Sequence, residues 1–232
     1  MTFWKTVRAG FERAIGRPGL LHRLGDGEKA IEIHDDGEWR WLTLGRGAIQ
    51  TKVDLDEPLA LPLPYTVGMV APLLLRDEYA HIAMLGLGGG ALLRFYHTFL
   101  PDCRFTVIER SRVMVNVART YFDAPVDDPR VEVVVADAAN AVRTIEPRFD
   151  LVLVDIFDAC GLPNWVLQPT FCNRCRELLV PGGLASLNLG RNCLRTSSGT
   201  LQRILQTHPT LITATMVVPD TLNIRVDRVI CS

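Results

Sequence analysis

The sequence predicts an α/β fold built on a doubly wound, mostly parallel sheet. Short apolar runs alternate along the chain with segments of helical periodicity, and these runs are apolar throughout rather than alternately polar. Such runs are typical of parallel strands that helices cover on both faces. A glycine-rich turn follows the first of the runs and opens directly into a helix, which is typical of Rossmann-like folds. We expect this domain at 54–232, after a small β segment at 1–53.

The N-terminal segment has a different pattern. Residues 30–53 alternate apolar and polar side chains around the turn residues Asp36 and Gly37, which predicts a β-hairpin or a small meander. Such a segment is too short to fold alone. The tryptophans of the N-terminal part, Trp4, Trp39 and Trp41, form either one face of the hairpin or a contact between subunits. Of the two we expect the subunit contact, and with it a homo-oligomer such as a dimer.

The central sheet follows a proline-rich connection at 54–65 and a helix expected at 66–79. Five apolar runs then predict its strands, at 81–87, 104–109, 131–136, 150–155 and 183–189. Near the C-terminus, 211–218 and 223–232 flank a Pro-Asp turn and predict a closing antiparallel pair of strands.

Two of the intervening helices have recognisable ends. Ser111 can cap a helix that follows Glu109, and Pro125 stops it. Its apolar positions repeat every four residues, at Val113, Val117 and Tyr121. Pro169 suits the first turn of a later helix, and Pro181-Gly182-Gly183 ends it. The side chains expected to face inward from this helix are Phe171, Cys175, Leu178 and Leu179.

Composition excludes several classes of function. The 232 residues carry a formal charge of −1, which gives no overall attraction for nucleic acid or for an anionic membrane. Charged side chains interrupt the first 20 residues, so no signal peptide is expected. The uncharged run at 59–75 is short and contains prolines, so we expect no membrane span.

The six cysteines are scattered along the chain, which favours a reducing cytoplasm over a disulfide-bonded protein. Cys172 and Cys175 have C-x-x-C spacing, but no second pair and no histidine cluster accompanies them. We therefore expect these two thiols to pack within a helix, and we expect no metal site.

Acidic residues follow three of the predicted strands. Glu109, Asp137 and Asp155 come at the ends of consecutive apolar runs, and the glycine turn at 86–90 ends the run before them. In an open parallel sheet these ends share one edge, where ligands bind. A single aspartate after a strand is more often a helix cap. A glycine turn and three acids at the ends of four successive strands favour a ligand pocket instead.

Two ligand classes fit such a turn. Gly86, Gly88 and Ala91 satisfy the G-x-G-x-x-A pattern of nicotinamide-dependent oxidoreductases, although that motif alone is weak evidence. The acids after the next runs, Asp137 and then Asp155 with Asp158, decide against it, because a dehydrogenase has no general need for an acid at each of those strand ends. A sulfonium nucleoside does, since its ribose, adenine amino group and cationic sulfur all favour acceptors. We therefore expect an adenosyl-sulfonium site.

Several segments resemble a known family in order and spacing. These are IAMLGLGGGALLR, FTVIERS, DPRVEVVVADAANAV, FDLVLVDIFDACGLP and LLVPGGLASLNL, with GAIQTKVDLDE upstream. Together they look like the catalytic domain of spermidine synthases and related polyamine aminopropyltransferases. DPRVEVVVADA is the nearest match, and the D-x-x-D is the most telling.

The resemblance implies a donor site and an acceptor site. In the donor site, Glu109 would hold the ribose, and Asp137 with Ala138 would hold the adenine. The other donor-binding residues would be Gln50, Gly86, Gly88, Gly89 and Gly90. The implied donor is decarboxylated S-adenosylmethionine, without a metal.

In the acceptor site, the resemblance gives Asp155 the task of orienting and deprotonating the attacking amine. Asp158 and Tyr65 would help to bind the diamine, for example putrescine. Trp165 lies in the loop beside the D-x-x-D, where it either lines the acceptor pocket or packs within the loop. The expected activity is therefore aminopropyl transfer to a polyamine.

The chain also departs from the family pattern. Gly89 stands where the family loop usually has an aspartate that faces the donor's ammonium group, and Ala159 replaces a common proline. A bare glycine loop presents only N–H groups, which suit the carboxylate of intact S-adenosylmethionine better than an ammonium. The alternatives are therefore a small-molecule methyltransferase and a non-catalytic nucleoside-binding relative.

Overall fold

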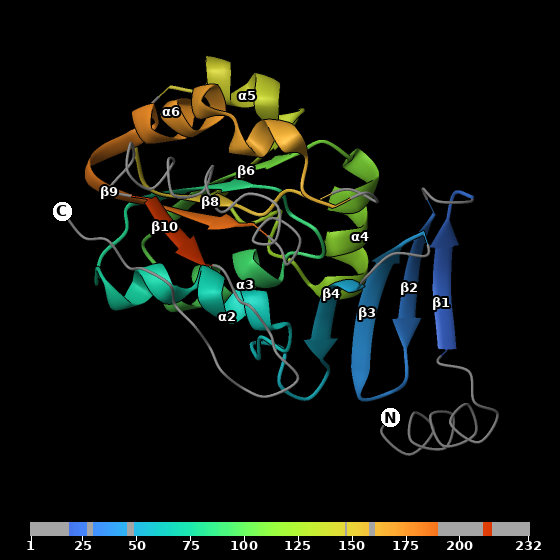
Figure 1. Cartoon of the computed structure of the whole chain (residues 1–232). Helices are drawn as coiled ribbons and strands as arrows, with labels where there is room; N and C mark the ends of the chain where they lie inside the picture. The colour runs from blue at the N-terminus through green and yellow to red at the C-terminus, as the bar shows by residue number, and fades with distance from the viewer. Residues whose placement is uncertain are drawn as a thin grey trace.

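The computed structural model describes residues 19–26, 30–45, 49–146, 148–157, 161–189 and 211–214. Its larger sheet consists of β5 (His81–Leu85), β6 (Arg104–Glu109), β7 (Val131–Val135), β8 (Phe149–Val154), β9 (Leu179–Asn188) and β10 (Leu211–Ala214). Every pairing in this sheet is parallel, and the strand order is β10-β9-β8-β5-β6-β7 (Figure 1). The predicted parallel sheet is therefore confirmed.

Both faces of this sheet are buried, which explains why its strands are apolar throughout. Within β5, Ile82 and Met84 belong to one apolar cluster, and Ala83 and Leu85 belong to the other. The first face is covered by α2 (Pro64–Met69), α3 (Ala91–Phe99) and α4 (Arg112–Phe122). The second is covered by α5 (Ala138–Thr144) and α6 (Pro169–Glu177), which lie above the sheet in Figure 1.

The two predicted helix starts are confirmed. The Ser111 hydroxyl accepts a hydrogen bond from the Met114 N–H at 3.2 Å and caps α4, and Pro169 begins α6. The predicted end of α6 is wrong. The helix ends at Glu177, and β9 begins two residues later, so the Pro-Gly-Gly segment lies inside β9. Pairing of Leu179 with the start of β8 places the beginning of this strand earlier than expected.

The single helix expected at 66–79 is also wrong. The chain forms α2, and then a short 3₁₀ turn, η2 (Ala71–Leu74). Pro72 explains the break, because it has no N–H with which to continue the hydrogen bonds of α2. The result is a short helix whose buried residues are Thr66 and Met69.

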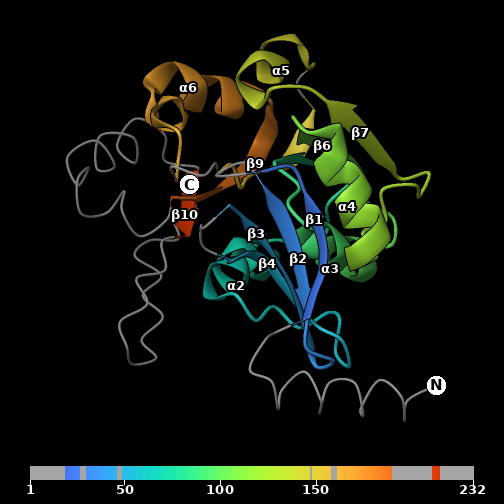
Figure 2. The same ribbon diagram turned by 90° about the vertical axis from the view of Figure 1, so that its right-hand side faces the viewer.

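The N-terminal sheet is antiparallel and contains β1 (Gly19–Leu24), β2 (Ile31–Asp35), β3 (Trp39–Leu44) and β4 (Ile49–Asp54). The predicted meander corresponds to β2, β3 and β4, and β1 was not predicted. Figure 2 shows this sheet lying alongside α4. The contact is apolar and is made by Ile33, Leu42 and Val53 from the sheet with Val117 and Phe122 from the helix.

The two tryptophans of β3 make contacts within the N-terminal sheet. The Trp41 ring stacks on His34, with 5.3 Å between ring centroids, and Lys52 Nζ lies 3.9 Å from the centroid of the Trp39 ring. These contacts correspond to the hairpin-face alternative. The homo-oligomer and the domain boundary at residue 53 stay predictions.

The expected antiparallel pair at the C-terminus is not seen. Residues 211–214 form β10, but this strand pairs in parallel with β9. Its predicted partner at 223–232 lies outside the described residues. A parallel neighbour of β9 extends the same sheet by one strand.

The described cysteines are buried thiols. Cys103, Cys172 and Cys175 are all buried, and burial raises the pKa of Cys172 to about 11. Within the described ranges, no group of three or more His, Cys, Asp or Glu side chains is arranged to hold a metal ion. No helix in this part of the chain combines the length and the apolar character needed to cross a membrane.

Candidate active site at the carboxyl edge of the sheet

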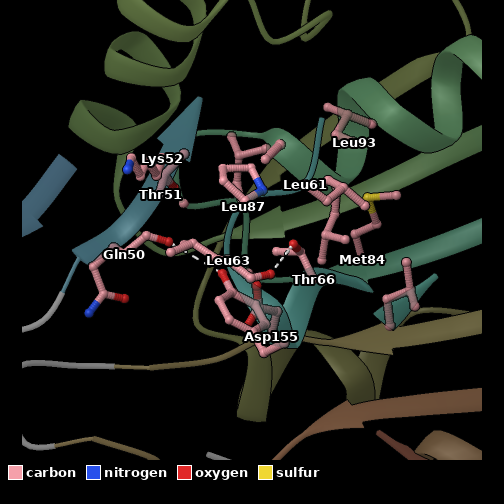
Figure 3. A pocket seen from close by; sticks show the side chains of 17 residues that line it. Gln50, Thr51, Lys52, Leu61, Leu63, Thr66, Met84, Leu87, Leu93 and Asp155 are labelled. Carbon is pink, nitrogen blue, oxygen red and sulfur yellow. Dashed lines mark hydrogen bonds between the residues drawn. The ribbon is translucent and has the colours of Figure 1, made fainter. Parts of the chain in front are cut away.

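The carboxyl ends of β5, β6 and β8 meet at one edge of the larger sheet. The Gly86 N–H donates to the Ile108 carbonyl of β6 at 2.8 Å, and the Asp155 N–H donates to the Leu85 carbonyl at 2.9 Å. A pocket lies at this edge (Figure 3). The glycine turn, β4, the start of α2 and Asp155 all contribute to its wall.

Close packing explains why the turn is built from glycine. A Cβ atom at Gly86 would lie 2.2 Å from the Asp155 carbonyl oxygen, and one at Gly89 would lie 2.6 Å from the Thr51 Cγ2 atom. Gly86 also has a φ of +96°, which disfavours any L side chain. The turn therefore approaches the end of β8 on one side and β4 on the other more closely than a side chain would permit.

Asp155 is the one carboxylate among the described residues that line the pocket. Its Oδ1 accepts a hydrogen bond from the Asn188 carboxamide at 2.8 Å, and the Tyr65 hydroxyl bonds to the same carboxylate. Burial raises the pKa of Asp155, while the hydrogen bonds from Asn188 and Tyr65 oppose this rise. A partly buried carboxylate with a raised pKa, next to a glycine turn, is suited to accept a proton from a ligand.

Tyr65 and Gln50 also line the pocket, and their roles in acceptor binding and donor binding stay predictions. The Tyr65 hydroxyl lies 3.3 Å from the Gln50 carbonyl oxygen and can donate its proton either to this oxygen or to Asp155. Burial raises the pKa of Tyr65 well above its usual value, and the neighbouring Asp155 charge adds to the rise. Tyr65 therefore remains a neutral hydrogen-bond donor near physiological pH.

Glu109 and Asp137 lie after β6 and β7 but do not line this pocket. Glu109 is buried, and its carboxylate accepts hydrogen bonds from the Leu87 N–H at 3.1 Å and the Ser111 N–H at 2.9 Å. Asp137 is exposed and caps α5 through the Ala139 N–H at 2.9 Å. Glu109 thus joins the glycine turn to α4, and the nucleoside-binding roles of Glu109, Asp137 and Ala138 stay predictions.

Comparisons with known proteins identify relatives. A family model described as "Methyltransferase domain" matches residues 82–183. The polyamine aminopropyltransferase of Chromobacterium violaceum is 35% identical over 68% of this chain and 60% of the relative. That of Neisseria meningitidis serogroup A is 32% identical over the same shares. The chain is thus similar to polyamine aminopropyltransferases over about two thirds of its length.

Solved structures show the same fold. A probable spermidine synthase from Corynebacterium glutamicum has a TM-score of 0.63 at 24% identity, over 72% of this chain and 63% of that chain. Spermidine synthase from Thermotoga maritima has a TM-score of 0.60 at 19% identity, over 81% and 62%. The chain spans only 60% of the length of the two aminopropyltransferases above.

Thr51 fills the space beside Gly89, where related aminopropyltransferases are expected to carry an acid. The buried Thr51 hydroxyl accepts a hydrogen bond from the Gly89 N–H at 2.8 Å, and its methyl group occupies the space that a side chain at 89 would need. An acid at this position would therefore require Thr51 to move. Sequence reasoning missed Thr51 and its neighbour Lys52, which also lines the pocket, although both directly follow Gln50 in the quoted segment.

The remaining acceptor-site predictions have different outcomes. Asp158 and Ala159 lie outside the described residues. Trp165 lies in η3 (Asn164–Leu167), outside the pocket wall, and packs edge-on against Phe171 with 5.0 Å between ring centroids. Asn188 was not predicted, because a carboxamide at the end of a strand belongs to none of the motifs in the sequence.

Proposed function

We propose that the chain transfers an aminopropyl group from decarboxylated S-adenosylmethionine to a diamine such as putrescine. One observation carries this proposal: Asp155 presents a partly buried carboxylate to a pocket that the glycine turn also lines. Similarity to two polyamine aminopropyltransferases supports the same reaction. The donor would bind through the glycine turn, Glu109 and Asp137, and the diamine would reach the pocket near Asp155.

The chemistry requires a neutral amine. An alkyl ammonium has a pKa of about 10.4, and only the deprotonated form has a lone pair to attack the methylene carbon beside the sulfonium. As the new C–N bond forms, the C–S bond breaks and its electron pair returns to sulfur, which leaves as a neutral thioether. Asp155 would accept the proton that the amine loses.

The surroundings of Asp155 favour this role. A carboxylate in water is too weak a base to deprotonate an ammonium, and its charge would stabilise the ammonium form. Burial raises the pKa of Asp155, and a pocket wall with Leu61, Leu63 and Leu87 would also remove water from the amine. Both effects reduce the difference in pKa between the base and the amine.

We expect the purified protein to make spermidine when it is incubated with putrescine and decarboxylated S-adenosylmethionine. Mass spectrometry should detect spermidine and the thioether product in equal amounts, since each transfer releases one of both. Omission of putrescine serves as the control. Failure to form either product, with a donor that binds, would leave the chain as a nucleoside-binding relative.

Methyl transfer from intact S-adenosylmethionine is a second candidate, and the pocket wall supplies the observation that favours it. Thr51 and Gly89 put a neutral hydroxyl and a backbone amide where an acid is usual. Neither offers a negative charge to the ammonium of an aminopropyl group, whereas the N–H groups of a glycine turn suit the carboxylate of intact S-adenosylmethionine.

Calorimetry with the two donors separates these candidates. Under the proposed function, the decarboxylated donor binds more tightly than the carboxylated one. Tighter binding of the carboxylated donor would reject aminopropyl transfer in favour of methyl transfer.

A further inference from the structure

Asn188 is a buried polar residue directly behind the pocket. It ends β9 and is only 6% exposed, and its carboxamide donates to the Asp155 Oδ1 atom at 2.8 Å. The two residues are 33 positions apart in sequence but lie on neighbouring strands, β8 and β9, where each strand ends. A buried carboxamide is costly unless it is hydrogen-bonded, so this contact is a specific feature of the edge.

We infer that Asn188 is a positioning residue for the proposed reaction, because its carboxamide fixes the Oδ1 atom of Asp155 and thereby orients the carboxylate toward the attacking amine. The inference rests on the proposed function. Without Asn188, the carboxylate would be held mainly by Tyr65, which can also donate to the Gln50 carbonyl. A carboxylate with two fixed donors has a defined direction, which a proton transfer requires.

The hydrogen bond also acts on the charge of Asp155. A donor stabilises the ionised carboxylate, so its removal would raise the pKa of Asp155 above the already raised value. Tyr65 from α2 and Lys52 from β4 are the other titratable side chains among the described residues of the pocket wall. Burial keeps Tyr65 neutral up to high pH, so it would not titrate in the range where Asp155 does.

The test compares four proteins by the pH dependence of kcat/KM. In Asn188→Leu, which keeps the branched shape but loses the donor, the rise of kcat/KM with pH should move to higher pH than in the original protein. Asn188→Gln keeps a carboxamide and should recover part of this change. Ser186→Ala is the matched control, since Ser186 is buried on the same strand but bonds to the Met69 sulfur at 3.5 Å. Its pH profile should be unchanged.

A second measurement does not depend on turnover. Carbon-13 NMR of protein labelled at aspartate carboxyl carbons follows the ionisation of Asp155, whose signal is identified by its absence in Asp155→Asn. In Asn188→Leu, this signal should titrate at higher pH than in the original protein. If Asn188→Leu does not fold, Asn188→Ser takes its place, because its hydroxyl ends short of Asp155.

The outcomes separate the two proposals. An unchanged Asp155 titration in the Asn188 variants, with a uniform loss of kcat/KM at all pH values, would overturn the role of Asn188. A protein that makes no spermidine, but whose Asp155 titration shifts as expected, would overturn the proposed function and leave the contact with Asn188 intact.

Discussion

Asp155→Asn is expected to lower kcat by at least about a hundredfold, which is the usual contribution of a general base. Asparagine keeps the shape of the side chain and can still accept the hydrogen bond from Asn188, but it cannot take up a proton. Binding of the nucleoside should change little, because the proposed donor contacts are made by other residues. Steady-state kinetics with calorimetry of donor binding measures both quantities.

The stability of this variant provides an internal check. The folded-state pKa of Asp155 is raised, so the folded protein holds this proton more tightly than the unfolded chain does. The resulting stabilisation is present at low pH and is lost as the pH rises through the raised pKa. At pH 8, Asp155→Asn should therefore be as stable as the original protein, or more stable. A large fall in Tm would indicate a structural role for Asp155.

Asp150→Asn is the matched control on the same strand. Asp150 is a buried carboxylate within β8, at the end opposite Asp155, where it accepts hydrogen bonds from the Ala80 and His81 N–H groups and pairs with Arg76 at 2.8 Å. Its replacement should lower the Tm while kcat stays nearly unchanged. If Asp155→Asn retained its turnover, Asp155 would have no part in the proton transfer.

The sequence predicted the larger sheet well because both of its faces are buried, so β5 to β8 are continuous apolar runs whose ends can be read within a residue or two. The helix expected at 66–79 failed because the periodicity of that segment says nothing about how one proline divides it. Local composition thus determined whether a segment forms a strand or a helix, whereas single residues determined where each strand or helix ends.

The candidate site was predictable to a smaller extent. Asp155 and the glycine turn stand at strand ends, which a parallel sheet must bring together. Thr51 and Asn188 contact the turn and Asp155 from 38 and 33 residues away, through side chains that are common in any strand. Their roles follow from strand order and register, and no local pattern of residues encodes either property.

The turn itself gives the largest expected loss of stability. Gly86→Ala should lower the free energy of unfolding by roughly 3 kcal/mol or more, from the combined cost of a positive φ and of overpacking. The new Cβ atom would lie 2.2 Å from the Asp155 carbonyl oxygen. This oxygen belongs to the backbone, so no side-chain rotation can relieve the overlap. In a protein of this size, thermal unfolding should show a fall in Tm of roughly 10 °C.

Gly182→Ala separates the two causes. Gly182 has a φ of +75°, but no heavy atom lies within 4 Å of a Cβ atom placed there, so this variant carries only the conformational cost, about 1 kcal/mol. The difference in stability loss between the two variants measures the energetic cost of overlap between the turn and the end of β8. Any folded Gly86→Ala protein must have moved the turn and the Asp155 backbone apart, so its kcat should also fall, while that of Gly182→Ala should not. Equal losses of stability in both variants would show that the turn can move away from β8 at little cost, and that the close approach does not fix the position of Asp155.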